Sequence, residues 1–166
     1  MCFVLYAGTV NPIPRRKWEK DAPGLSIESL TERDAPVKAH FSNPEVQYIG
    51  STSGCGCDFP HAMFQNFSWP EIEYLEHVEE DPERAATDRQ NKEAIVGLLR
   101  AFGETVVELY GIWNGDFAKV PEIEESIAVE TILDPAFCFK ERGFYKVAVD
   151  RVNESEKSDY PWKVNL

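Results

Sequence analysis

The chain has 166 residues, of which 43% are hydrophobic and 28% are charged. This length and apolar content allow a buried core, which excludes a disordered chain and favours a single globular domain over residues 1–166. With 17 basic and 29 acidic residues the formal net charge is −12, which argues against a nucleic-acid partner, because binding phosphates requires clustered Lys and Arg.

Targeting signals are not evident in the sequence. The N-terminus lacks the basic residues that precede the apolar core of a signal peptide, and no apolar run approaches the roughly 20 residues of a membrane span. Four cysteines are too few and too irregularly spaced for a secreted disulfide framework. We therefore expect a reduced, cytoplasmic protein with no membrane partner.

Strands dominate the predicted elements of the first sixty residues. Phe3, Leu5 and Ala7 alternate with Val4 and Tyr6, which is the period of a strand with two distinct faces. Asp34 is the expected N-cap of a short helix. The predicted elements are a strand over 2–9, a strand over 25–30, a short helix over 35–41 and a strand over 46–49.

A long helix over 82–102 is the strongest feature of the second half. Its expected buried stripe is Ala85, Ile95, Leu98, Leu99 and Phe102, and Gly103 should end it. The other predicted elements are a short helix over 68–78, strands over 105–113 and 127–133, and two strands within 137–152. This order predicts an α+β fold, with a mixed or mostly antiparallel sheet, one long helix and two or three short helices.

A glycine-rich loop with two cysteines follows the predicted strand over 46–49. Cys55 and Cys57 flank a glycine, so their sulfurs can converge. Asp58 can cap a short helix that begins near Phe59 and Pro60. If that helix reaches back to Cys57, then His61 lies one turn further along the same face. Thiolate and imidazole are ligands that Zn²⁺ prefers.

The sequence therefore predicts a transition-metal site at Cys55, Cys57 and His61, with Zn²⁺ as the candidate ion. Both cysteine side chains should point into one pocket at the end of the strand over 46–49, with His61 on its rim. A fourth ligand is open among Asp58, His40, Cys2 and Cys138.

Four other interpretations of these residues and of the charge remain. The two cysteines of the loop can carry out thiol redox chemistry, or can serve only as small buried apolar side chains. Cys2 becomes an N-terminal nucleophile of a hydrolase if Met1 is removed. The acidic chain can also be a non-catalytic interaction module that binds a basic protein partner.

Overall fold

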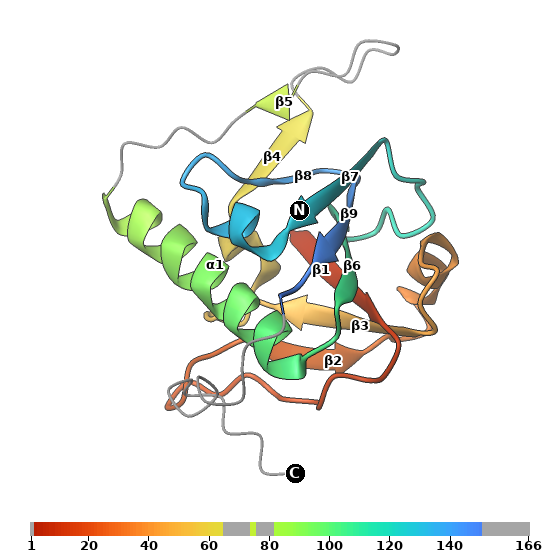
Figure 1. The fold of residues 1–166 in the computed structure, drawn as a ribbon, viewed down its shortest axis with the longest axis horizontal. Helices are drawn as coiled ribbons and strands as arrows, with labels where there is room; N and C mark the ends of the chain where they lie inside the picture. The colour runs from red at the N-terminus through yellow and green to blue at the C-terminus, as the bar shows by residue number, and fades with distance from the viewer. Residues whose placement is uncertain (1, 65–73, 76–81, 151–166) are drawn as a thin grey trace.

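The described residues of the computed structural model, 2–64, 74–75 and 82–150, form one long helix and two β-sheets (Figure 1). Three short 3-10 helices, η1 to η3, connect the strands in this part of the chain. The elements in chain order are β1 (Phe3–Thr9), β2 (Ser26–Ser29), η1 (Ala35–His40), β3 (Glu45–Gly50), η2 (Gly56–Asp58), β4 (His61–Phe64), β5 (Tyr74–Leu75), α1 (Pro82–Phe102), β6 (Val106–Trp113), β7 (Ile123–Ala128), η3 (Val129–Leu133), β8 (Phe139–Lys140) and β9 (Gly143–Ala148).

The larger sheet has six strands in the order β2-β3-β1-β6-β9-β7. Its neighbouring strands are antiparallel except β7 and β9, which run parallel. Strand β1 lies between β3 and β6, so Leu5 is opposite Ile49 on one side and Gly111 on the other. Every residue of β1 is buried. This mixed sheet with one long helix confirms the predicted α+β fold.

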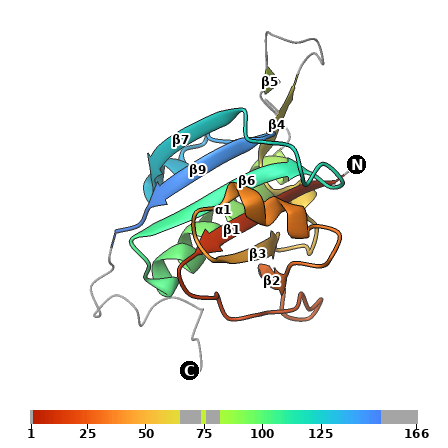
Figure 2. The same ribbon diagram turned by 90° about the vertical axis from the view of Figure 1, so that its right-hand side faces the viewer.

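A smaller sheet has the order β5-β4-β8. Strand β4 pairs antiparallel with β5 and parallel with β8. In Figures 1 and 2, β4 and β5 extend away from the six-stranded sheet at the top of the molecule. Strand β4 begins immediately after the cysteine-containing loop, so this sheet fixes the far end of that loop.

The two faces of the larger sheet carry separate apolar clusters. Helix α1 covers one face, where Ile95 and Leu99 pack with Leu5 of β1. The other face carries η1, whose Val37 packs with Tyr6. Figure 2 shows the helix and η1 on opposite sides of the strands, which confirms the predicted alternation along β1.

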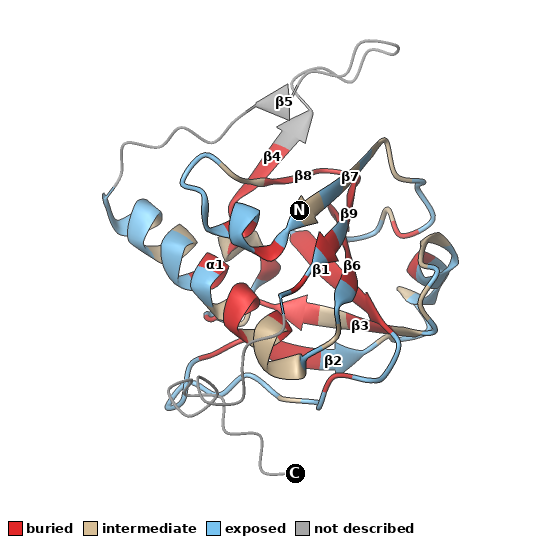
Figure 3. Cartoon of the chain, in the orientation of Figure 1, coloured by how far each residue is buried: buried red, intermediate tan, exposed pale blue. Residues whose placement is uncertain are grey.

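Helix α1 begins and ends at the predicted residues. Gly103 ends it with a φ of +80°, and its N–H donates to the carbonyl of Leu99. The predicted stripe is wrong at Ala85, which is exposed, because burial along the helix begins at Asn91 (Figure 3). None of the described helices combines the length and the apolar character needed to cross a lipid bilayer.

The strand predicted over 127–133 has the wrong bounds. Strand β7 ends at Ala128, and the residues from Val129 form the 3-10 helix η3. A 3-10 helix has three residues per turn, so Val129 and Ile132 both face the core, whereas Leu133 is 39% exposed. The spacing of apolar residues in this segment is therefore compatible with a short helix as well as with a strand.

Two predicted short helices also need correction. The backbone of Phe59 is extended and the chain enters β4 at His61, so no helix begins at residues 59–60. Most of the helix predicted over 68–78 lies outside the described residues, and its described part, Tyr74–Leu75, is strand β5. The short helix after Asp34 is present as η1 with Asp34 at its N-cap position, as predicted, but the Asp34 side chain accepts from Thr31 and makes no capping hydrogen bond.

Candidate metal centre

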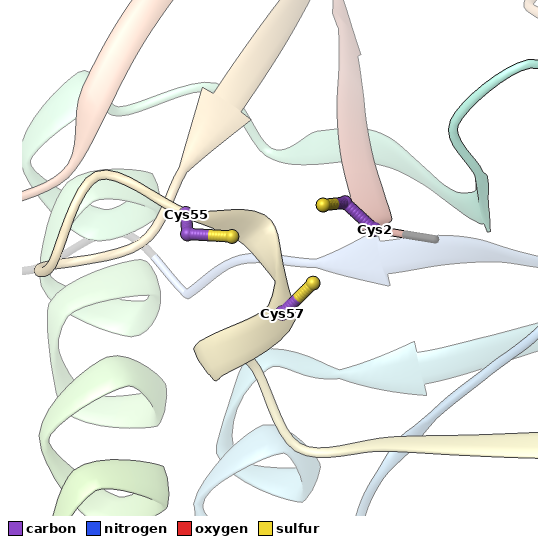
Figure 4. Close-up of side chains that lie close together, drawn as sticks. All are labelled: Cys2, Cys55 and Cys57. Carbon is purple, nitrogen blue, oxygen red and sulfur yellow. The ribbon is translucent and has the colours of Figure 1, made fainter.

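Three cysteines from two distant parts of the chain meet beside the start of β1. Cys2 immediately precedes β1, whereas Cys55 and Cys57 lie at the beginning of η2. The sulfur atoms of all three lie within 4.8 Å of one another. Figure 4 shows the side chains pointing toward a common centre. The structure therefore brings together the two predicted loop cysteines and adds Cys2.

The contact between the loop and β1 depends on the absence of a side chain at Gly56. A Cβ atom at this position would lie 2.3 Å from the carbonyl oxygen of Phe3 and 3.3 Å from the Cα atom of Val4. Both are backbone atoms, which cannot rotate away as a side chain can. Gly56 thus lets the Cys-Gly-Cys segment lie directly against the backbone beside Cys2.

Two side chains of α1 hold the loop from the opposite side. Asn91 is fully buried, and its Oδ1 accepts from the backbone N–H of Thr52 (2.9 Å) and from its hydroxyl (3.1 Å). Its Nδ2 donates to the carbonyl of Asp58 (3.1 Å). Arg84 donates to the carbonyl of Cys57 (3.3 Å). Both ends of the cysteine segment are therefore anchored to the helix.

A turn within the loop determines the direction of the backbone just before Cys55. Gly54 has a φ of +88°, a conformation that glycine adopts without strain, and its N–H donates to the carbonyl of Ser51. Trp18 covers this turn and donates from Nε1 to the carbonyl of Thr52 (2.9 Å). Trp18, from the segment between β1 and β2, thus has a structural contact with the loop.

The thiol of Cys57 is held in its protonated form. Its pKa is raised to about 11, mainly by burial and in part by hydrogen bonding with the thiols of Cys55 and Cys2. A hydrogen bond from the backbone N–H of Phe3 acts in the opposite direction, because it stabilises the thiolate. A cation at the centre of the cluster would strengthen that second effect by displacing the proton.

The hydroxyl of Tyr48 lies beside the same segment. Burial raises the pKa of Tyr48 to about 12, with a further rise from the nearby Cys55. Its oxygen accepts a hydrogen bond from the backbone N–H of Gly56. Tyr48 thus connects β3 to the cysteine segment and remains a neutral phenol at physiological pH.

His61 occupies the core beside the cluster and is not one of its members. Its ring stacks on Phe3, with centroids 4.7 Å apart, and makes an edge contact with Trp113. Its Nδ1 lies 2.7 Å from the carbonyl oxygen of Phe59. The structure places His61 on β4 rather than one helical turn after Cys57, so the reason for including it in the sequence-based ligand set is lost.

Cys2 alone of the four fourth-ligand candidates belongs to the described cluster. Asp58 instead accepts from the hydroxyl of Ser53, and His40 Nε2 lies 3.3 Å from the carbonyl of Phe117. Cys138 lies just before β8, outside the cluster.

The pairing of β1 with β3 explains why Cys2 lies in the cluster. These strands are antiparallel, with Leu5 opposite Ile49, so the start of β1 lies beside the end of β3. The loop that follows β3 must therefore pass close to Cys2. Sequence patterns predict both strands but not which strands pair, and for that reason the third sulfur was only one of several candidates.

A cavity of about 330 Å³ opens beside two of the three cysteines. Cys2 and Cys55 line it, together with Tyr48 and the side chains of the segment that enters η1. Neither Cys57 nor His61 is among its lining residues. Of the two loop cysteines, whose sulfur atoms lie within 4.8 Å of each other, only Cys55 lines this cavity.

Comparisons with models of known protein families, with curated proteins and with solved structures find no match to this chain. What the site can do is therefore inferred from its own residues. Three sulfur atoms in this arrangement are close enough to hold one metal ion.

Proposed function

We propose that the protein binds Zn²⁺ through the thiolates of Cys2, Cys55 and Cys57. The observation that carries this proposal is the approach of the three sulfur atoms to within 4.8 Å of one another. Tetrahedral Zn–S bonds of about 2.3 Å imply S···S separations of about 3.8 Å, so a small inward rotation of the side chains would suffice. The anchored loop and the backbone contact at Gly56 support a site that is largely preformed.

Charge favours Zn²⁺ over Cu⁺, the other common partner of thiolate ligands. Three thiolates around Zn²⁺ carry a net charge of −1, whereas around Cu⁺ they carry −2. With the same thiolate ligands Zn²⁺ therefore leaves the site less negative than Cu⁺ would, and this difference remains when a fourth ligand binds. Three protein ligands also leave one position of tetrahedral Zn²⁺ open, which is typical of catalytic rather than structural zinc sites.

Thiol redox chemistry is the second candidate, because Cys2 and Cys55 are both exposed. Two of the clustered thiols would then lose two protons and two electrons to a small-molecule disulfide, which would be reduced to two thiols. The third cysteine would remain available to attack the new disulfide. This chemistry uses the same three residues but requires no metal.

Metal analysis of single variants tests the zinc proposal. Purified full-length protein should contain one equivalent of zinc after reconstitution and desalting. We expect Cys2→Ser, Cys55→Ser and Cys57→Ser each to lower the zinc affinity at least tenfold, because each removes one thiolate. Cys138→Ser is the matched control outside the cluster and should keep wild-type affinity.

The Cys2→Ser and His61→Gln variants decide between the two ligand sets. The cluster proposal expects loss of zinc in the first and retention in the second. The opposite pattern would favour the sequence-based set of Cys55, Cys57 and His61. Protein that binds no zinc yet loses two free thiols on treatment with oxidised glutathione would overturn the zinc proposal and support the redox candidate.

The other sequence-based hypotheses remain predictions. A hydrolase with Cys2 as nucleophile requires removal of Met1, which intact mass measures directly. An acidic interaction module requires a basic partner whose binding weakens steeply with salt, and retention of that partner at high salt would contradict it. Our zinc proposal assumes a reducing compartment such as the cytoplasm, which keeps the three thiols available.

A further inference from the structure

The cavity beside the cysteines is large enough for a small molecule. Its volume of about 330 Å³ lies at the lower end of the range for ligand pockets, about 300–1,000 Å³. Cys2 and Cys55 form part of its wall, so a ligand within it would lie beside two of the three proposed metal ligands. Val4 and Phe117 supply apolar surface.

Arg33 is the cationic side chain of this cavity. Its guanidinium carbon lies 5.8 Å from the centroid of the Phe117 ring, and it forms no ion pair with any other described residue. A guanidinium in this setting can bind a carboxylate of a ligand through two parallel hydrogen bonds.

The acidic side chain of the cavity, Asp34, is already engaged within the protein. Its Oδ1 accepts from the N–H (2.5 Å) and hydroxyl (2.7 Å) of Thr31, and its Oδ2 lies 3.4 Å from the hydroxyl of Tyr6. Tyr48 also lines the cavity, and its hydroxyl, whose pKa burial raises to about 12, is a neutral group that can donate a hydrogen bond. Of the two charged side chains of the cavity, Asp34 is thus engaged by hydrogen bonds and Arg33 forms no ion pair with a described residue, which favours an anionic ligand.

We propose that this cavity binds a small anionic thiol, a molecule with one thiol and at least one carboxylate. This inference rests on the proposed Zn²⁺ site. The ligand's sulfur takes the open fourth position of the metal, and its carboxylate pairs with Arg33. On binding, the ligand's thiol releases its proton to solvent, the metal-bound water leaves, and one Zn–S bond replaces one Zn–O bond.

Cobalt-substituted protein provides the test, because Co²⁺ adopts the same tetrahedral geometry and its thiolate charge-transfer absorption increases with each sulfur ligand. Two probes of similar size are compared, 3-mercaptopropionate with a carboxylate and 2-mercaptoethanol without one. We expect both to increase the charge-transfer absorption, and 3-mercaptopropionate to bind about tenfold more tightly because of its charge-assisted hydrogen bonds to Arg33.

The Arg33→Gln variant should bind Co²⁺ as the wild type does and lose the preference for 3-mercaptopropionate. Arg89→Gln is the matched control, because Arg89 is exposed on α1 and does not line the cavity. It should keep the preference. Equal affinity of the wild type for the two probes, or an undiminished preference in Arg33→Gln, would overturn the inference.

Different experimental results distinguish a failure of this inference from a failure of the proposed function. If Co²⁺ and Zn²⁺ do not bind in the absence of added thiol, the metal site itself is wrong and the inference falls with it. If the metal binds in a 1:1 ratio but neither probe changes the absorption, the metal site stands and only the ligand assignment is wrong.

Discussion

At the scale of single residues, the site depends on the absence of a side chain at Gly56. Cys55 and Cys57 would be close to each other in almost any loop, but the third sulfur arrives only because the loop touches the backbone of Phe3. That contact lies between backbone atoms, so it tolerates no side chain. Gly56 is therefore as important for a three-sulfur site as the cysteines are.

The Gly56→Ala variant tests this dependence while keeping all three thiols. The added Cβ would meet the carbonyl oxygen of Phe3 at 2.3 Å, so the loop must move away from β1. We expect zinc affinity to fall at least tenfold and the free energy of unfolding to fall by about 1–3 kcal/mol, as overpacking typically costs. Competition with a chromophoric chelator and denaturant unfolding measure the two effects.

Gly8→Ala is the matched control for that variant. Gly8 lies near the other end of β1, where an added Cβ would meet the ring of Phe41 at 2.3 Å. We expect a loss of stability without a change in zinc affinity. If both variants lowered zinc affinity equally, the effect would reflect general destabilisation and not the contact at Gly56.

The protonation of Cys57 predicts a pH dependence of metal binding. Because its pKa is raised to about 11, the thiol carries its proton at neutral pH, and Zn²⁺ must displace that proton. Affinity should therefore rise with pH, at least tenfold per unit between about pH 6 and 8. Chelator competition, corrected for protonation of the chelator, measures the slope. An affinity independent of pH would contradict thiolate ligation by Cys57.

At the scale of elements, helix α1 serves as the support of the loop. Its second half packs on the sheet through apolar side chains, as its sequence pattern predicts. Asn91 is the polar exception, buried on the same helix and hydrogen-bonded to both Thr52 and Asp58. Its position ties the loop to the most regular element of the molecule.

Replacing Asn91 should therefore loosen the loop from the helix. Asn91→Ala removes its hydrogen bonds to Thr52 and Asp58 and leaves a small cavity. We expect the free energy of unfolding to fall by about 2–4 kcal/mol. Amide hydrogen exchange at Thr52 should become faster, and zinc affinity should fall. Gln90→Ala, at an exposed neighbouring position, is the control. Equal stability of the two variants would contradict this supporting role.

Sequence patterns predict the elements of this fold better than the contacts among them. Alternation in β1 and the glycine after α1 are local signals, and both predictions are confirmed. The prediction of a strand is wrong for residues 129–133, because a 3-10 helix can bury the same apolar residues as a strand. His61 was grouped with Cys57 through a helix that does not form, whereas Cys2 joins the site through strand pairing, which local spacing does not encode.

At the scale of the whole molecule, the cluster connects the first strand to a loop that also contacts α1. Cys2 immediately precedes β1, the buried strand between β3 and β6. The loop with Cys55 and Cys57 is in turn bound to the helix through Asn91. A metal ion held by all three sulfurs would therefore cross-link segments that are far apart in the unfolded chain.

This cross-link predicts that zinc stabilises the folded protein. The unfolded chain offers only the adjacent pair Cys55 and Cys57 at short range, so it binds zinc more weakly than the folded chain. At free zinc of about 100 times Kd, we expect the free energy of unfolding to rise by about 2.7 kcal/mol. Thermal unfolding with zinc and with a chelator measures the difference, which Cys2→Ser should largely abolish. If protein with bound zinc unfolded at the same temperature as metal-free protein, zinc would bind the folded and unfolded chains equally, and a site assembled by the fold would be contradicted.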